Sequence, residues 1–174
     1  MQIAVIWHAL SLTAASPKPG DPGDPPLCAR GRRQAEETAH VLHLVLPANP
    51  AARPVILHSP ALRAKETAEI IGGYLNADLV LEDDALGERS WPSEAEADAW
   101  VAYHAKRLLT DDGVTRILVT HMEPLRHLAR ALPALYDDKR VPIVGNDLKP
   151  ILAPGRGFYL GRDIPTHVSI RPNA

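Results

Sequence analysis

The sequence predicts an α/β fold, a three-layer α/β/α sandwich in which a mainly parallel central sheet carries helices on both faces. Short apolar runs alternate along the chain with longer segments whose apolar residues recur at helical spacing, as in strand–helix–strand units. The composition, 45% hydrophobic and 23% charged residues, is that of an ordinary globular protein. We expect a single domain spanning residues 1–174, because this length suffices for one core and is short for two.

A loop separates the first expected strand from the first expected helix. Ile3–Trp7 is a nearly continuous apolar run, which is typical of a strand buried on both faces. Residues 16–26 alternate Pro, Gly and Asp, and proline's fixed φ and missing N–H donor exclude a helix or a central strand there. Residues 29–46 then repeat apolar side chains at helical spacing, and Pro47 ends the predicted helix.

A second strand–helix unit follows. Residues 55–57 form a short buried strand. Ser59 is the predicted N-cap of the next helix, with Pro60 at its first position. That helix is expected to end near Gly72, Gly73 or Asn76.

The remaining elements repeat the pattern and end in strands. We expect a strand at residues 79–81, a helix at 94–109, a strand at 116–120 and a helix at about 124–132. In the tail, residues 148–170, two short β-like runs at 157–160 and 167–170 flank a turn at residues 161–163. The alternation of strands and helices predicts parallel pairing, with the tail strands added at one edge.

Charge and cysteine content narrow the choice of partner and compartment. A formal net charge of -2 argues against nucleic acid or an acidic membrane as the main partner, because neither would be held by a near-neutral surface. The single cysteine, Cys28, cannot form an internal disulfide. Met1 and Gln2 supply no positive region for a signal peptide, and no apolar run reaches membrane-spanning length. We expect a cytoplasmic protein.

Reactive side chains follow three of the expected strands directly. The segments are Trp7-His8-Ala9, His58 to Arg63, and Thr120-His121. Ligands of parallel sheets bind outside the carboxyl ends of the strands, where helix N-termini also favour an anion. A lone histidine after a strand is more often structural, but three such coincidences favour one shared crevice that binds an anion.

The same segments resemble the motifs of the histidine phosphatase (phosphoglycerate mutase-like) superfamily. The Ser-Pro-x-x-Arg-Ala-x-x-Thr-Ala signature is met in full by Ser59, Pro60, Arg63, Ala64, Thr67 and Ala68. The segment that commonly opens the first helix is matched by Leu27, Gly31, Gln34 and Ala35, and the second family histidine by Thr120-His121. The short interval between Arg63 and His121 resembles the compact phosphohistidine phosphatases (SixA-like type). The resemblance implies a phosphoglycerate mutase-like fold.

The resemblance also implies roles for individual residues. His8 would attack phosphorus and form a phosphohistidine intermediate, while Arg63 holds the non-bridging oxygens. His121, if protonated, would add a second positive donor. Glu88, in Leu86-Gly87-Glu88, is the candidate acid for the leaving group; the alternative is a surface carboxylate. No metal or other cofactor is required, because arginine and histidine supply the charge.

The chain departs from the family pattern beside the nucleophile. Trp7 stands where the family has arginine, and the loss of one charge-assisted contact costs about 1.5–3 kcal/mol. Ala9 replaces glycine, and Cys28 replaces the usual threonine. Lys18, Arg30, Arg32 and Arg89 are candidates for compensating contacts, with a surface or packing role as the favoured alternative for each, and His58 and Ser59 are further candidates for substrate binding.

Two hypotheses therefore stay open. The favoured one is a metal-independent phosphatase that acts through His8 on phosphohistidine or a small phosphomonoester, impaired to some degree by Trp7. The other is a catalytically inactive module that keeps the fold and binds a phosphorylated ligand or protein. Both predict a phosphate-bearing small molecule or a phosphohistidine protein as partner, with neither nucleic acid nor a membrane.

Overall fold

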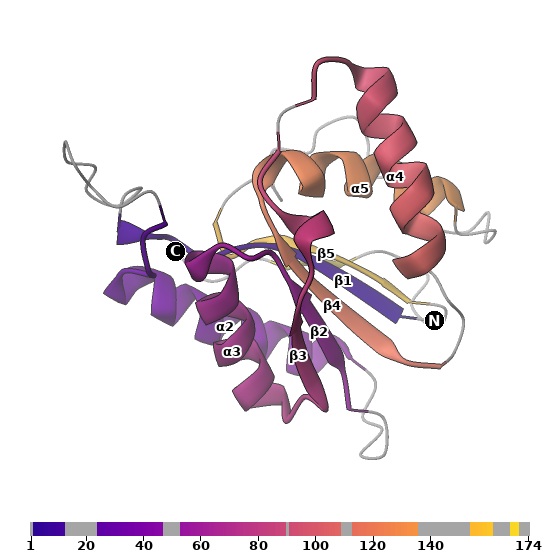
Figure 1. Cartoon of the computed structure of the whole chain (residues 1–174). Coiled ribbons are helices and arrows are strands. Elements are labelled where there is room, and N and C mark those ends of the chain that lie inside the picture. Colours follow the sequence, from indigo (N-terminus) through magenta and orange to yellow (C-terminus); the bar gives the residue numbers. More distant parts are fainter. Residues whose placement is uncertain are drawn as a thin grey trace.

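A six-stranded sheet with helices on both faces forms the framework of the protein (Figure 1). The computed structural model describes residues 2–12, 24–46, 53–89, 91–108, 113–135, 154–161 and 168–170. The strands are β1 (Gln2–Trp7), β2 (Val55–His58), β3 (Leu79–Glu82), β4 (Thr115–Thr120), β5 (Gly157–Gly161) and β6 (Val168–Ile170). The helices are α2 (Ala29–Val45), α3 (Leu62–Leu75), α4 (Glu94–Leu108) and α5 (Met122–Leu135), with a short 3-10 helix, η1 (Asp84–Leu86). The predicted α/β class is confirmed.

The strand order is β3-β2-β4-β1-β5-β6. The four strands β3, β2, β4 and β1 pair in parallel, whereas β5 and β6 run antiparallel at the other edge. The predicted parallel sheet with tail strands added at one edge is therefore correct. Strands β1 and β4, which are far apart in the sequence, lie at the centre of the sheet, and two further strands follow on either side of this pair.

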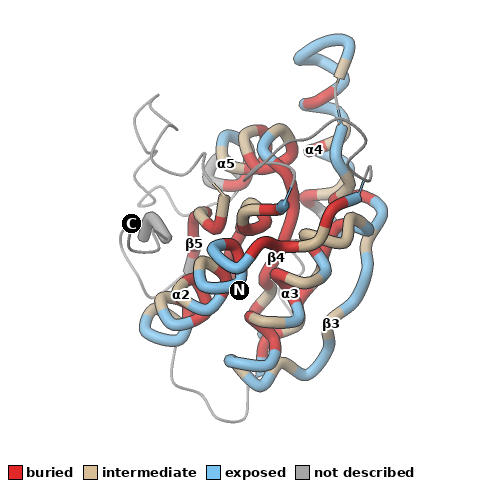
Figure 2. The backbone as a smooth tube through the Cα atoms, turned by 90° about the vertical axis from the view of Figure 1, so that its left-hand side faces the viewer, coloured by how far each residue is buried: buried red, intermediate tan, exposed pale blue. Residues whose placement is uncertain are grey.

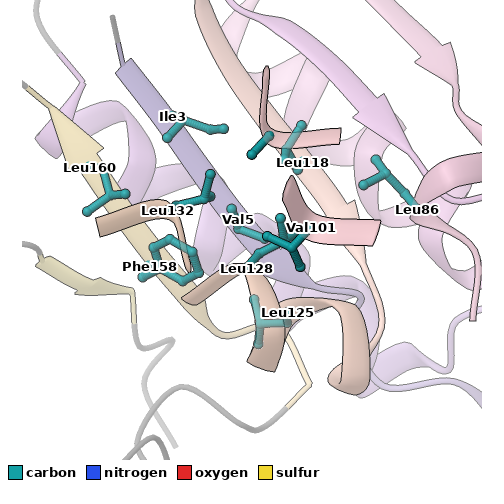
Figure 3. Close-up of a cluster of buried hydrophobic side chains, with 11 residues drawn as sticks. Ile3, Val5, Leu86, Val101, Leu118, Leu125, Leu128, Leu132, Phe158 and Leu160 are labelled. Atoms are coloured by element: carbon teal, nitrogen blue, oxygen red, sulfur yellow. The ribbon is translucent and has the colours of Figure 1, made fainter. Parts of the chain in front are cut away.

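The two faces of the sheet bury separate apolar clusters. Along β1, Ile3 and Val5 face α4 and α5, where they pack with leucines of α5 and with Phe158 (Figure 3). Ala4 and Ile6 point to the opposite face, against α2 and α3. This alternation is the period of two expected of a strand buried on both sides. Figure 2 shows the contrast with β3, an edge strand that is mostly exposed.

Two helix starts differ from the prediction. The predicted N-cap at Ser59 is wrong: α3 begins at Leu62, after a cap residue, Ala61, that offers no side-chain hydrogen bond. The backbone N–H of Leu62 is instead satisfied by both oxygens of the Asp24 carboxylate, at 2.8 and 2.9 Å. Helix α5 begins at Met122 rather than near Pro124, and proline is tolerated there because first-turn N–H groups have no intrahelical partner.

Close packing in the first turn of α2 requires a glycine at position 31. A Cβ built on this glycine would lie 1.9 Å from the carbonyl oxygen of Leu10, so no larger residue fits without a backbone shift. Cys28 caps the same helix, because its sulfur accepts from the Gly31 N–H at 3.3 Å. The start of α2 is thereby held against the segment that follows β1. None of the described helices is long and apolar enough to cross a membrane.

Candidate active site

The strand order brings the three predicted reactive segments together. Strand β4 lies between β1 and β2, so the segments that leave these strands are neighbours. The His8 N–H donates to the Thr120 carbonyl at 2.9 Å, and the Ser59 N–H donates to the Val119 carbonyl at 2.9 Å. Both segments are therefore fixed to the end of the central strand, on either side of His121.

The His8 ring turns an unprotonated nitrogen toward Trp7 and Arg63. Its Nδ1 lies 2.8 Å from the Ala9 carbonyl oxygen, which can only accept, so the proton is assigned to Nδ1. Nε2 then accepts from Trp7 Nε1 and from Arg63 Nε, each at 3.1 Å. Burial lowers the pKa of His8 from 6.5 to about 3, so the ring is neutral at pH 7. A neutral imidazole is the form that acts as a nucleophile, once the two donors release the Nε2 lone pair.

Arg63 contacts most of the other site residues. Besides His8, its Nη2 donates to Glu88 Oε2 at 2.6 Å, and its Nη1 lies 3.4 Å from Asp24 Oδ1. The same Nη2 lies 3.5 Å from His121 Nδ1. The Arg63 side chain is only 12% exposed, and its guanidinium is a cation with donors only. It therefore places a positive charge beside Nε2 of His8.

His121 and Ser59 form a buried pair. Ser59 Oγ lies 2.7 Å from His121 Nε2 and also accepts from the Ala61 N–H at 3.2 Å. Burial, followed by the charge of Arg63, lowers the pKa of His121 to about 4, so this ring is neutral at pH 7. The expected positive donor is therefore not present in this state. The His8 and His121 rings are 5.0 Å apart between centroids, close enough to share one phosphoryl group.

Glu88 and Asp24 are the acidic residues of the site. Glu88 follows η1 and is 71% exposed, yet its carboxylate engages Arg63. Asp24 contacts the same guanidinium and the first N–H of α3. Sequence reasoning missed Asp24, because it lies in the Pro, Gly and Asp segment, where no periodicity distinguishes one aspartate from another.

Trp7 is directed into the site. Its indole N–H points at the reactive nitrogen of His8, while the ring packs against the apolar cluster under α4 and α5. It supplies one neutral donor at the position where the family has arginine. The side chain therefore takes part in the site instead of turning away from it.

Ala9 and His58 are buried next to the site and make contacts of their own. Ala9 is fully buried against Leu27 and Ala35, and its N–H donates to Thr67 Oγ1 at 3.0 Å. His58 is 4% exposed, and its Nδ1 lies 2.8 Å from the Ser59 carbonyl oxygen. In the described part of the chain, no hydrogen bond joins the His58 ring to the residues around His8.

The proposed compensating cations that the structure describes are exposed or engaged elsewhere. Arg32 pairs with Glu66 at 2.8 Å, and Arg89 lies over the Trp100 ring, 5.7 Å from its centroid. Arg30 is exposed on α2. Lys18 lies outside the described residues. Within the residues that the structure covers, no three His, Cys, Asp or Glu side chains stand close enough to hold a metal ion.

The site places a neutral imidazole, a guanidinium cation and several N–H donors around one point. A site of this class suits transfer of a phosphoryl group. The family model described as histidine phosphatase superfamily (branch 1) matches residues 4–106. The chain belongs to the histidine phosphatase superfamily, as its motifs predict.

Solved structures support the same fold. The protein histidine phosphatase SixA, complexed with tungstate, is 17% identical, with a TM-score of 0.62 over 97% of this chain and 94% of that one. A phosphoserine phosphatase from Entamoeba histolytica, in complex with 3-phosphoglyceric acid, is 16% identical, with a TM-score of 0.63 over 99% and 96%. A mycobacterial glucosyl-3-phosphoglycerate phosphatase is 17% identical, with a TM-score of 0.60 over 92% and 90%. Comparison with curated proteins gave no match.

Proposed function

We propose that this protein is a metal-independent phosphatase that acts through His8 on phosphohistidine or a small phosphomonoester. One observation carries the proposal: the Ala9 carbonyl holds the proton on Nδ1 of His8, so the lone pair is on Nε2, which accepts from the Arg63 guanidinium at 3.1 Å. Nucleophile and charge are therefore in place for attack on phosphorus. The substrate would be a small molecule or a phosphohistidine protein of the cytoplasm, with no role for nucleic acid or a membrane.

The reaction would run in two displacements. The Nε2 lone pair of His8 attacks phosphorus, the bond to the leaving group breaks, and the leaving group departs with that electron pair. Water then attacks the phosphohistidine, and the P–N electrons return to Nε2 as phosphate is released. Arg63 and Trp7 now donate to Nε2, and both would turn their N–H groups to the non-bridging oxygens as the new bond forms.

The leaving group decides what Glu88 must do. An alkoxide needs a proton, and Glu88 would give it only if its carboxyl group were protonated on the bound substrate. Phosphohistidine has a better leaving group and makes less demand on an acid. Because Glu88 is ion-paired with Arg63 and 71% exposed, the geometry favours phosphohistidine over an alkyl phosphomonoester.

A second candidate is a module that binds a phosphorylated ligand without turning it over. Two observations favour it: Trp7 supplies a neutral donor where a cation is expected, and both Nη atoms of Arg63 already contact carboxylates. A ligand phosphate would have to displace Glu88 and Asp24 from the guanidinium. Such a site would bind phosphate weakly and accelerate its transfer little.

The deciding experiment measures hydrolysis of an aryl phosphate and of a phosphohistidine peptide in the presence of EDTA. Wild type is compared with His8→Ala, and with His43→Ala as an exposed histidine away from the site. We expect turnover in wild type and His43→Ala, none in His8→Ala, and an acid-labile phosphoenzyme after rapid quenching. Tungstate binding without turnover in wild type would establish the binding module instead.

A further inference from the structure

The start of helix α2 makes contacts that the proposed reaction leaves unexplained. Three of its residues, spaced three positions apart, lie against Leu10, two residues beyond the nucleophile: Cys28, Gly31 and Gln34. Gln34 Oε1 accepts the Leu10 N–H at 3.1 Å, and the Cys28 N–H donates to the Leu10 carbonyl at 3.1 Å. Gly31 leaves room for this approach, because a Cβ there would lie 1.9 Å from the same carbonyl oxygen.

Gln34 holds the peptide unit that faces the His8 ring. The Leu10 N–H and the Ala9 carbonyl belong to one planar unit, so a contact that fixes the direction of this N–H also fixes the direction of the carbonyl. That carbonyl oxygen lies 2.8 Å from His8 Nδ1. The Gln34 side chain therefore acts on the His8 ring through a single rigid group.

Other groups hold the peptide units on either side. The Ala9 N–H donates to Thr67 Oγ1 at 3.0 Å, and the Leu10 carbonyl accepts from Cys28, so the backbone is anchored before and after the Ala9–Leu10 unit. The motion that these anchors leave free is rotation of the unit about the line between its two Cα atoms, through ψ of Ala9 and φ of Leu10. Gln34 opposes this rotation by holding the N–H.

The direction of the Ala9 carbonyl matters most during the reaction. In the free protein Trp7 and Arg63 also donate to Nε2 of His8, so three contacts keep the proton on Nδ1. On the path proposed above, both donors turn to the phosphoryl oxygens, and of the three contacts only the carbonyl remains. As Nε2 bonds to phosphorus the ring becomes cationic, and a carbonyl that accepts from Nδ1–H stabilises that charge. Burial lowers the pKa of His8 to about 3, and the Ala9 carbonyl opposes this fall.

We infer that Gln34 is a positioning residue: its side-chain oxygen clamps the Ala9–Leu10 peptide and so aims the Ala9 carbonyl at Nδ1 of His8. The effect of this clamp on the reaction rests on the phosphatase activity proposed above. The clamp itself does not, so it is measurable whether or not the protein hydrolyses a phosphate.

The chain offers a matched control for the substitution. Gln2 is the only other glutamine, and its Oε1 also accepts a hydrogen bond, from the Thr115 hydroxyl at 2.7 Å. Both glutamines are half-buried, but Gln2 begins β1, at the end of the strand opposite His8. Gln34→Met and Gln2→Met therefore remove the same acceptor at two distant places, whereas Gln34→Glu keeps an acceptor oxygen at position 34.

The test combines NMR with kinetics. Imidazole N–H signals of 15N-histidine-labelled protein are recorded at pH 7 for wild type and the three variants, with His8→Asn to assign the His8 signal. A proton held by the carbonyl exchanges slowly with water, so we expect a visible Nδ1–H signal in wild type, Gln34→Glu and Gln2→Met, and its loss or broadening in Gln34→Met. We expect kcat to fall about 10- to 100-fold in Gln34→Met alone, with KM nearly unchanged, because the weakened bond is one to a charged ring.

Each outcome bears on the inference. A sharp His8 Nδ1–H signal in Gln34→Met would overturn it, and so would an equal loss of the signal in Gln2→Met. If Gln34→Met does not fold, hydrogen exchange in wild type decides: the Leu10 N–H must exchange slowly, and rapid exchange refutes the clamp. Where wild type turns over, an unchanged kcat in Gln34→Met removes Gln34 from the reaction. If wild type shows no turnover, the proposed function fails, while the Nδ1–H signal still judges Gln34.

Discussion

Replacing Trp7 tests whether the neutral donor beside His8 limits the site. The indole gives one N–H, 3.1 Å from His8 Nε2, whereas an arginine would give a charged fork at the same place. Hydrogen bonds to charged groups are worth about 1.5–3 kcal/mol and neutral ones about 0.5–1.5 kcal/mol, so the gain is about 1–1.5 kcal/mol. We therefore expect Trp7→Arg to raise kcat/KM for an aryl phosphate about 5- to 15-fold.

Trp7→Phe isolates the N–H from the ring. It keeps the aromatic packing against the cluster under α4 and α5 but removes the donor, so kcat/KM should fall by about 2- to 13-fold. The assay is the initial rate with p-nitrophenyl phosphate in EDTA, accompanied by the melting temperature of each variant. Equal kcat/KM values for all three proteins would show that the indole N–H does not reach the phosphoryl group, and the reasoning would fail.

Three further perturbations follow from the structure. Glu88→Gln should tighten tungstate binding by at most about 5-fold in isothermal titration, because the exposed ion pair that it removes is worth about 0.2–1 kcal/mol. If Glu88 is the acid, the same variant should slow hydrolysis of phenyl phosphate more than that of p-nitrophenyl phosphate in rate measurements. His8 and His121 bind protons near pH 6.5 in the unfolded chain but only near pH 3 and 4 in the folded protein, so the unfolded chain holds more protons between these values. The free energy of unfolding should therefore fall by on the order of a few kcal/mol from pH 7 to pH 4. Urea titrations of wild type and His121→Gln measure this fall, and an equal dependence of the unfolding free energy on pH in both proteins would contradict it. Gly31→Ala should destabilise the folded protein by about 1–3 kcal/mol, because the new Cβ would meet the Leu10 carbonyl. Gly73 has open space around it, so Gly73→Ala should be neutral or stabilise the protein by up to about 1 kcal/mol, and thermal denaturation distinguishes the two variants.

Topological rules made the location of the site predictable. Three buried runs end in His8, His58-Ser59 and His121, and parallel strands place such ends at one edge of the sheet. The motif around Arg63 then indicated phosphate chemistry. The location needed only periodicity, chain direction and residue type, whereas the phosphate chemistry came from the resemblance to histidine phosphatases.

Details that depend on side-chain direction were not predictable. The sequence predicts Ser59 as a helix cap and as a candidate for substrate binding, whereas in the structure its hydroxyl lies 2.7 Å from His121 Nε2. The burial that makes both site histidines neutral results from packing by several elements at once, and a single sequence does not reveal it. Asp24 belongs to no recognisable pattern, because its role comes from a contact with the N–H of Leu62, 38 positions later in the sequence.

The central place of β4 also governs when the site can form. Strands β1 and β2 do not touch each other, since each pairs with β4, whose residues lie near position 120. As a ribosome releases the chain from the N-terminus, His8 and Arg63 emerge long before the strand that will hold their segments together. His8 and Arg63 can take up their mutual positions only once β4 has been made. The site therefore cannot assemble before residue 120 has been synthesised, and the long-range pairing predicts slow folding.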